Sequence, residues 1–286
     1  MTGVHLGRIG IWSTGLRFGD QAMIPEAAAE IDELGFGAIW IPGGAGGDIL
    51  DAVDRLLRAT RRLTVATGII NIWKHEPGEI TAWWKALPAD HQSRVLLGLG
   101  VSHGPMIGDA YAAAKPLHVM RDYLDRLEAE GMPGNRLCIA ALAPRMLELA
   151  RERTAGAHPY LVTPEHTGWA RGILGPGILL APEQGVMLET DNARARALAE
   201  SALTHYRRLP NYINSWLRLG FSQEEIGRLD NRFLEALFAW GGTERIKARI
   251  DAHFDAGASH VAVQAITGGD IAADRAAWRV LAANLL

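Results

Sequence analysis

The sequence lacks several features that mark common protein classes. It has a single cysteine, Cys138, which lies in an apolar run, so no intramolecular disulfide can form. Its apolar runs fall far short of the roughly 20 residues that a bilayer span requires. No charged flank followed by a long apolar segment stands near Met1, so nothing there resembles a signal peptide. We therefore expect a cytoplasmic protein.

An excess of charge of one sign is also absent. The formal net charge is −3, and the Lys and Arg residues are scattered along the chain. This distribution favours neither nucleic acid nor an anionic membrane as a partner, which leaves a small-molecule substrate as the expected one. There is no His-Glu-x-x-His pattern, and one cysteine cannot build a thiolate site, so no metal site is expected. A Gly-x-Ser-x-Gly nucleophile motif is also missing.

The chain does have the composition of a large folded domain. Its 286 residues are 48% hydrophobic and 21% charged, and no linker or low-complexity segment divides them. We expect one domain over residues 1–286, in which eight short apolar strands alternate with helices. This pattern favours a single (β/α)₈ TIM barrel, with an open doubly wound sheet as the alternative. The strands are expected at 8–12, 37–41, 63–67, 94–99, 136–141 and 259–265, with the sixth strand and its exit loop at 155–162 and the seventh strand within 177–188, split around Pro182.

Local signals place several helices and one insertion. Asp48 and Thr163 are predicted to be N-caps. Residues 78–91 and 229–240 are expected to be helical. Residues of about 210–230 are expected to form an irregular insertion with one short helix, which the capping-box pattern Ser222-x-x-Glu225 opens.

The stretch Leu63–Pro77 resembles a binding site more than a turn. A β-branched strand stops at Gly68, and Asn71, Trp73 and the residues up to His75 crowd polar and aromatic groups into a short connection. In a barrel, the loops that follow the strands form the active site. Trp12 ends another predicted strand and, like Trp73, is suited to wall a flat ring system.

Two glycine-rich stretches allow other interpretations. Residues 43–47 either cradle a phosphate or form a tight turn before Asp48, and they lack the Lys-Ser/Thr ending of a P-loop. The pattern Gly98-x-Gly100-x-x-x-Gly104 is followed by Pro105 and a long loop rather than a helix. This context argues against a dinucleotide-binding fingerprint.

Three further residues are candidates for binding or proton transfer. His158 is either a structural histidine bonded to a backbone carbonyl or part of the site. Thr163 stands at a helix N-terminus, where free N–H groups and the helix dipole favour an anion. His103 titrates in a range that suits a proton donor, or else it is a loop histidine facing water.

Several stretches together resemble the coenzyme F420-dependent branch of the luciferase-like oxidoreductases of mycobacteria and other actinobacteria. The resemblance covers nearly the whole chain. It rests on GIWSTGLRFGD, AIWIPGGAGGDILD, VATGIINIWKHEP, LLGLGVSHGP, RMLELARERTAGAHPYLVTPEHT, LLAPEQGVMLETDNARARALA, LPNYINSW and AGASHVAVQ.

This resemblance implies a TIM barrel with extra loop segments and a deazaflavin cofactor. It implies a non-proline cis peptide at Gly68–Ile69 behind the deazaflavin ring, and a cofactor phosphate near residues 156–163. It also implies that a homodimer is possible. The cofactor-binding residues expected are Trp12, Gly68, Ile69, Asn71, Ser102, Gly156, Ala157, His158, Tyr160 and Thr163, with His103 as the catalytic proton donor.

The leading hypothesis is an F420-dependent oxidoreductase that transfers a hydride between the deazaflavin C5 and a carbonyl or activated double bond, without activating oxygen. One alternative is an FMN-dependent luciferase-like monooxygenase, and another is a non-catalytic F420-binding protein. An aldolase- or isomerase-type barrel would need a Schiff-base lysine or paired carboxylates at strand ends. Lys74 and Glu76 are weak candidates for those roles.

Overall fold

The computed structural model describes residues 4–43, 47–102, 107 and 115–286. Within these residues a single sheet runs through the molecule, and all of its pairings are parallel. Its strands are β1 (Ile9–Trp12), β2 (Ala38–Ile41), β3 (Thr64–Thr67), β4 (Ile70–Asn71), β5 (Val95–Gly100), β6 (Leu137–Ile139), β7 (Gly156–Ala157), β8 (Leu179–Leu180), β9 (Glu183–Met187), β10 (Phe238–Trp240) and β11 (Val261–Ala265).

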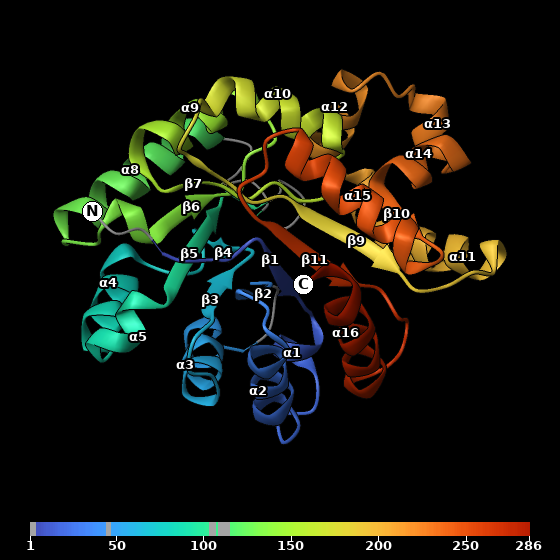
Figure 1. The fold of residues 1–286 in the computed structure, drawn as a ribbon. Helices are drawn as coiled ribbons and strands as arrows, with labels where there is room; N and C mark the ends of the chain where they lie inside the picture. The colour runs from blue at the N-terminus through green and yellow to red at the C-terminus, as the bar shows by residue number, and fades with distance from the viewer. Residues whose placement is uncertain (1–3, 44–46, 103–106, 108–114) are drawn as a thin grey trace.

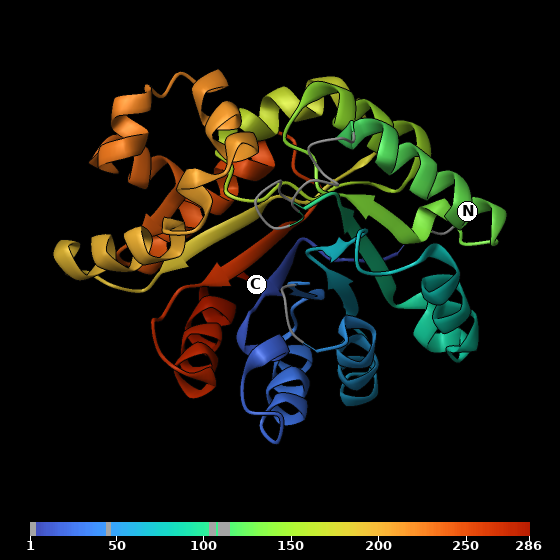
Figure 2. The same ribbon diagram turned by 180° about the vertical axis from the view of Figure 1, so that it is seen from behind.

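Helices follow the strands and lie around the sheet in Figures 1 and 2. They are α1 (Gly15–Phe18), α2 (Ile24–Leu34), α3 (Ile49–Ala59), α4 (Pro77–Ala86), α5 (Ala89–Ser93), α8 (Pro116–Ala129), η1 (Gly134–Arg136), α9 (Pro144–Arg153), α10 (Pro164–Leu174), α11 (Asn192–Leu203), η2 (Tyr206–Arg208), α12 (Pro210–Arg218), α13 (Gln223–Arg228), α14 (Asn231–Leu237), α15 (Thr243–Asp255) and α16 (Ile271–Leu285). The side chains of Asp48 and Thr163 cap α3 and α10, as predicted.

The sheet curls back on itself, so that its terminal strand β8 reaches β11. Its order is β10-β9-β11-β1-β2-β3-β5-β6-β7-β8, and β4 pairs with β5. The terminal strand β8 continues through Pro182 into β9, which confirms the predicted split. The N–H groups of Ser259 and His260 donate to the Leu180 carbonyl at 2.8 and 3.4 Å, which joins β8 to the start of β11. The architecture is therefore TIM-barrel-like, as the sequence predicted.

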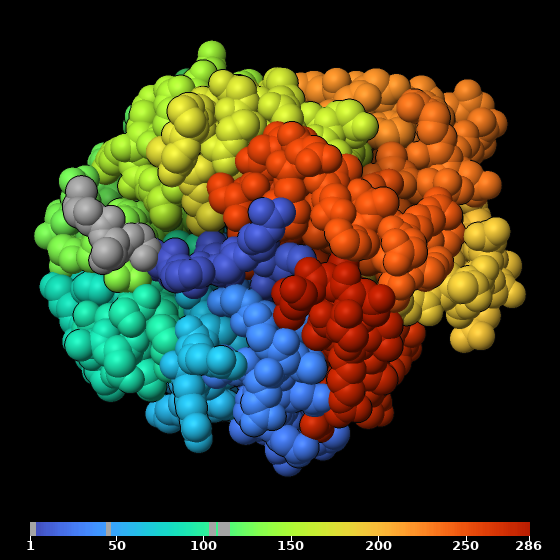
Figure 3. Space-filling view, viewed as in Figure 1, coloured from blue at the N-terminus to red at the C-terminus, as the bar shows by residue number. Residues whose placement is uncertain are grey.

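The interior of the barrel is made largely of small side chains. Alanines on neighbouring strands, among them Ala38, Ala66 and Ala262, belong to this inner core and leave room for the fully buried ring of Trp40. A larger aliphatic core lies between the sheet and the surrounding helices. Leu6 belongs to the inner core, and the N-terminal segment, in dark blue, crosses the centre of the face shown in Figure 3.

Helices α11–α14 pack around a separate core beside the barrel. We call the segment α11–α14 the insertion. It is seen as the yellow-to-orange helices at one side of Figures 1 and 2. Its buried residues are rich in aromatic rings, with Trp216, Phe221 and Phe233 packed edge to face at centroid distances of 5.0 and 5.2 Å.

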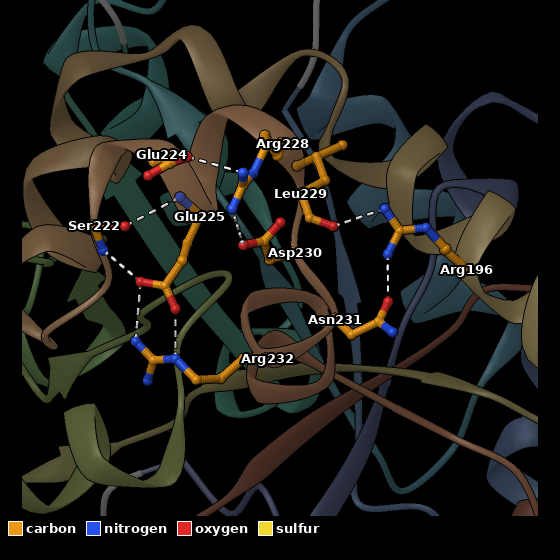
Figure 4. Close-up of polar contacts among 9 residues, drawn as sticks. All are labelled: Arg196, Ser222, Glu224, Glu225, Arg228, Leu229, Asp230, Asn231 and Arg232. Carbon is orange, nitrogen blue, oxygen red and sulfur yellow. Dashed lines mark hydrogen bonds and ion pairs between the residues drawn. The ribbon is translucent and has the colours of Figure 1, made fainter.

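Polar contacts tie the helices of the insertion together (Figure 4). The predicted capping box is present: Ser222 Oγ accepts from the Glu225 N–H at 3.1 Å, and Glu225 Oε2 accepts from the Ser222 N–H at 2.8 Å. Arg232 donates to both oxygens of Glu225. Arg196 donates to the Leu229 carbonyl at 2.9 Å, which links α11 to the end of α13.

Three predictions about local structure were wrong. The helix expected at 78–91 is two helices, because Pro88 cannot continue a helix and instead caps α5. The helix expected at 229–240 stops at Leu237, and aromatic Phe238–Trp240 forms β10 beside β9. The stretch 210–230, where one short helix was expected, contains α12 in addition to the capped α13, because Pro210 is favourable in a first helical turn.

None of the helices described is long and apolar enough to cross a lipid bilayer.

Candidate functional site

A cavity of about 570 Å³ opens where the strands end. It receives residues from the ends of β1, β2, β3, β5, β6 and β7, which is where TIM-barrel active sites form, and its remaining wall comes from the insertion. Its lining is Trp12, Pro42, Gly43, Gly68, Ile69, Asn71, Gly100, Val101, Ser102, Pro116, Ala140, Ala141, Leu142, Ala143, Met146, His158, Tyr160, His205, Tyr206, Asn211, Tyr212, Asn214 and Arg218.

The floor of the cavity is the backbone at Gly68–Ile69. This peptide is cis, as the resemblance implied. Glycines on two neighbouring strands make room for it. A Cβ on Gly43 would lie 2.1 Å from the Ile69 carbonyl oxygen, one on Gly98 would lie 2.0 Å from the Thr67 carbonyl oxygen, and one on Gly100 would lie 2.5 Å from Ile69 Cδ1. Any larger residue at these positions would displace the floor.

His158 lines the cavity beside Gly68 and is 1% exposed. Its Nδ1 is 2.7 Å from the Ala181 carbonyl oxygen, so Nδ1 carries the proton and Nε2 is an acceptor. Its ring stacks on Trp40 at 4.1 Å and an interplanar angle of 15°. Burial lowers its pKa to about 4, so the ring is neutral at pH 7. The two interpretations of this histidine are compatible, because it bonds a backbone carbonyl and also lines the cavity.

Trp12 meets His158 at Gly68. A Cβ on Gly68 would lie 2.6 Å from Trp12 Nε1 and 2.7 Å from His158 Nε2, which explains the glycine. Both nitrogens are buried, and neither has a hydrogen-bond partner among the residues described. The indole ring packs on Tyr160 at a centroid distance of 5.2 Å. An indole donor and an imidazole acceptor therefore converge at Gly68.

Three tyrosines form the wall that joins barrel and insertion. The rings of Tyr160 and Tyr206 are 5.3 Å apart, and those of Tyr206 and Tyr212 are 5.1 Å apart. The Tyr160 hydroxyl donates to Gln264 Oε1 at 3.0 Å. Burial raises the pKa of all three hydroxyls, so they remain protonated donors at physiological pH.

Behind this wall lies Glu183, a residue that the sequence did not single out. Its carboxyl is buried, which raises its pKa to about 8. Its Oε2 accepts from the Leu161 N–H at 3.2 Å, and Trp216 Nε1 donates to the Leu161 carbonyl at 3.1 Å. Leu161 has φ +53°, so the turn after Tyr160 is held from the barrel and the insertion in a conformation that leucine rarely adopts. No local sequence pattern marks Glu183, because its importance depends on the bond to the distant Leu161 turn.

Other predicted residues fall in or near the cavity. Asn71 lines it, and its Oδ1 accepts from the Trp73 N–H at 3.0 Å. Trp73 is not part of the lining, and its Nε1 donates to the Val101 carbonyl at 2.8 Å. Ser102 lines the cavity with φ +57°. His103 lies outside the residues described.

The residues expected near the cofactor phosphate do not all reach this cavity. Gly156 packs against β8, since a Cβ there would lie 1.9 Å from the Leu179 carbonyl oxygen, and Ala157 is fully buried. Thr163 Oγ1 caps α10 by accepting from the His166 N–H at 3.3 Å. None of the three lines the cavity, whereas Arg218, which was not predicted, does.

No metal centre is found in the described part of the chain, where no three His, Cys, Asp or Glu side chains are grouped to hold an ion.

Comparison with known proteins gives a consistent picture of the fold. The model of the luciferase-like monooxygenase family matches residues 8–130. No curated protein matches the chain in sequence. An F420-dependent secondary alcohol dehydrogenase, solved with an F420-acetone adduct, has a TM-score of 0.71 at 12% identity, with 97% of both chains covered.

Two other solved structures differ in cofactor. The F420-dependent tetrahydromethanopterin reductase from Methanopyrus kandleri has a TM-score of 0.68 at 14% identity, with 100% of each chain covered. The oxygenating constituent of 3,6-diketocamphane monooxygenase from Pseudomonas putida, solved with FMN, has a TM-score of 0.72 at 13% identity, covering 99% of this chain and 98% of that one. The chain thus has the TIM-barrel-like fold of luciferase-like proteins.

Proposed function

We propose that this chain is a luciferase-like oxidoreductase that binds coenzyme F420 in the cavity and transfers a hydride between it and a small carbonyl compound or activated alkene. The observation that carries the proposal is the cis Gly68–Ile69 peptide at the cavity, beside the aromatic rings of Trp12 and Tyr160. Gly43 and Gly100 leave room for the Ile69 carbonyl oxygen and the Ile69 side chain, which fixes the place of this peptide.

The residues present fit a deazaflavin in three respects. Trp12 and Tyr160 supply aromatic surface beside the Gly68–Ile69 peptide. Asn71 and Ser102 add polar groups at one edge. The described lining carries no carboxylate, so nothing in it repels an anionic cofactor.

When bound, the deazaflavin supplies the hydride chemistry, and the protein supplies position and protons. Trp12, Tyr160 and Tyr206 enclose the ring end of the cavity and exclude water from it. Burial keeps the tyrosine hydroxyls protonated, and the one hydroxyl proton of Tyr160 is already donated to Gln264. His158 stays neutral and holds its orientation through Ala181. His103 remains a proposed proton donor.

Titrating the purified protein separately with F420 and FMN tests the proposal. We expect micromolar or tighter binding of F420, and oxidation of the reduced cofactor when a suitable ketone or enone is added. Binding of FMN alone, with oxygen uptake in the presence of reduced FMN, would instead identify a monooxygenase. Tight F420 binding without turnover across ketones, enones and nitroaromatics would identify a non-catalytic binding protein.

A further inference from the structure

We propose that Arg218 binds an oxyanion of the ligand, the phosphodiester group of the deazaflavin cofactor, where α9 begins. This inference rests on the proposed function. Arg218 comes from α12 of the insertion and is the only residue with a permanent charge among the described lining residues of the cavity. A cavity with one cation and no carboxylate attracts an anionic group to that cation.

The guanidinium is anchored at the cavity wall. Nη2 donates to the Leu142 carbonyl at 2.5 Å, and the guanidinium carbon lies 5.8 Å from the centre of the Trp169 ring. An arginine side chain has five N–H donors in a planar fork, so further donors remain after the bond to Leu142. A phosphodiester oxygen pair matches that fork in a bidentate arrangement. The side chain is thus held in place while it retains donors for a ligand.

The start of α9 adds to the positive potential at this point. Ala143 and Met146 line the cavity, and Ala143 is an N-cap without a side-chain hydrogen bond. The first turn of this ten-residue helix contains no acidic residue. The positive end of the helix dipole and the Arg218 guanidinium therefore lie on either side of Leu142.

The start of α10, where the resemblance suggested the phosphate, is less suited to an anion. The Thr163 hydroxyl oxygen already caps that helix, and the side chain is buried away from the cavity. Glu165 lies in the first turn and opposes an anion there. Electrostatics therefore favours the start of α9.

A second, independent feature indicates that the same cavity receives a ligand. The Trp12 and His158 side chains line it, are 3% and 1% exposed, and each keeps a buried nitrogen without a partner among the residues described. Buried polar atoms normally have partners. A ligand that spans the cavity from Gly68 to Arg218 would have its ring near these nitrogens and its phosphodiester at α9.

The test compares R218Q with the unaltered protein by titration with two probes: F420, and the deazaflavin alcohol that lacks the phosphodiester and its tail. We expect R218Q to weaken F420 binding about tenfold or more, because a charge-assisted hydrogen bond is lost. Binding of the alcohol should not change. The affinity of the unaltered protein for F420 should also fall as salt is added, and R218Q should flatten that dependence.

Two further variants complete the test. R58Q removes the same charge from the last turn of α3, outside the cavity, and should leave F420 binding unchanged. R218K keeps the charge without the fork and should give an intermediate affinity. Thermal melts of each variant check folding.

Equal affinity of R218Q and the unaltered protein for F420 would overturn the inference, as would equal weakening of both probes, which would indicate a change in cavity shape. Binding of neither probe to the unaltered protein would overturn the proposed function itself, and with it this inference.

Discussion

The barrel and the insertion form opposite sides of one cavity, and they are built differently. The barrel side is made of glycine, alanine and partly unpaired polar groups, with Trp12 Nε1 and His158 Nε2 buried and unpartnered among the residues described. The insertion side has a dense aromatic core around Trp216 and Phe233, tied by the polar contacts of Figure 4.

This difference separates two tasks. Bare backbone on the barrel side lets a flat ligand approach closely but leaves little freedom to substitute residues. The insertion side contributes the charged lining group, Arg218, and further polar groups such as Asn214, on an independent core. We infer that the barrel side determines what kind of ring binds, and that the insertion determines what is attached to it.

The largest expected effect is on the barrel side, from G98A. Its new Cβ would lie 2.0 Å from the Thr67 carbonyl oxygen, a backbone atom that cannot move without shifting the floor. We expect a loss of roughly 3 kcal/mol or more in the free energy of unfolding, measured by urea denaturation. G172A is the matched control, because a Cβ there, in the last turn of α10, meets nothing within 4 Å, and it should stabilise by roughly 0.5–1 kcal/mol. Similar changes in the free energy of unfolding for G98A and G172A would refute the claim that the barrel side tolerates little substitution.

The next largest effect is expected where the insertion contacts the barrel, at Trp216 and the Leu161 carbonyl. W216F removes the indole N–H that bonds the Leu161 carbonyl and leaves that buried carbonyl unpaired. We expect a loss of about 1–3 kcal/mol together with weaker ligand binding, because the turn after Tyr160 is released. W84F is the control, since Trp84 Nε1 has no partner among the residues described, and it should not alter ligand affinity. Unchanged binding in W216F would show that this contact does not shape the cavity.

A third prediction concerns pH and the carboxyl of Glu183. Between its usual pKa of 4.5 and its folded value of about 8, the folded chain keeps a proton that the unfolded chain has lost. Stability therefore falls as pH rises through this window, with a slope of at most about 1.4 kcal/mol per pH unit. E183Q should remove this slope, and measuring both proteins by chemical denaturation at several pH values checks it.

The window from pH 6.5 to 8 is the informative one for Glu183. Burial lowers the pKa of His158 and His260 from 6.5 to about 4, and that of His253 to about 3. These histidines reduce stability as the pH falls below 6.5, which is the opposite direction. Parallel pH profiles of E183Q and the unaltered protein above pH 6.5 would contradict the assignment.

The smallest effect is expected in the insertion, from S222A. This change removes the side-chain cap on the Glu225 N–H and should cost about 1 kcal/mol of stability. Ligand affinity should not change, because Ser222 does not line the cavity. Circular-dichroism melts and an F420 titration measure both quantities, and a marked loss of F420 affinity would contradict the separation of tasks.

The sequence predicted most of the barrel because its signals are local. Apolar β-branched runs and N-caps such as Asp48 and Thr163 act over a few residues, and the structure has them where expected. Phe238–Trp240 was mistaken for helix because only its pairing with β9 makes it a strand. That pairing joins segments about fifty residues apart and leaves no local pattern.

The site was predicted in part for the same reason. The residues at which individual strands stop or end can be identified from the sequence, and all of them line the cavity: Gly68, Trp12, Asn71, Ser102, His158 and Tyr160. Arg218 and Glu183 could not be found in this way. Arg218 enters the cavity through the packing of α12, and the importance of Glu183 depends on the distant Leu161 turn.

The central claim is that a deazaflavin lies on the Gly68–Ile69 floor, and a crystal structure of the protein with F420 tests it most directly. We expect that structure to show the deazaflavin ring against Gly68–Ile69, beside Trp12 and Tyr160, with the phosphodiester at Arg218. A ring bound elsewhere, for example in the groove between α11 and α16 lined by Leu198 and Val280, would contradict it.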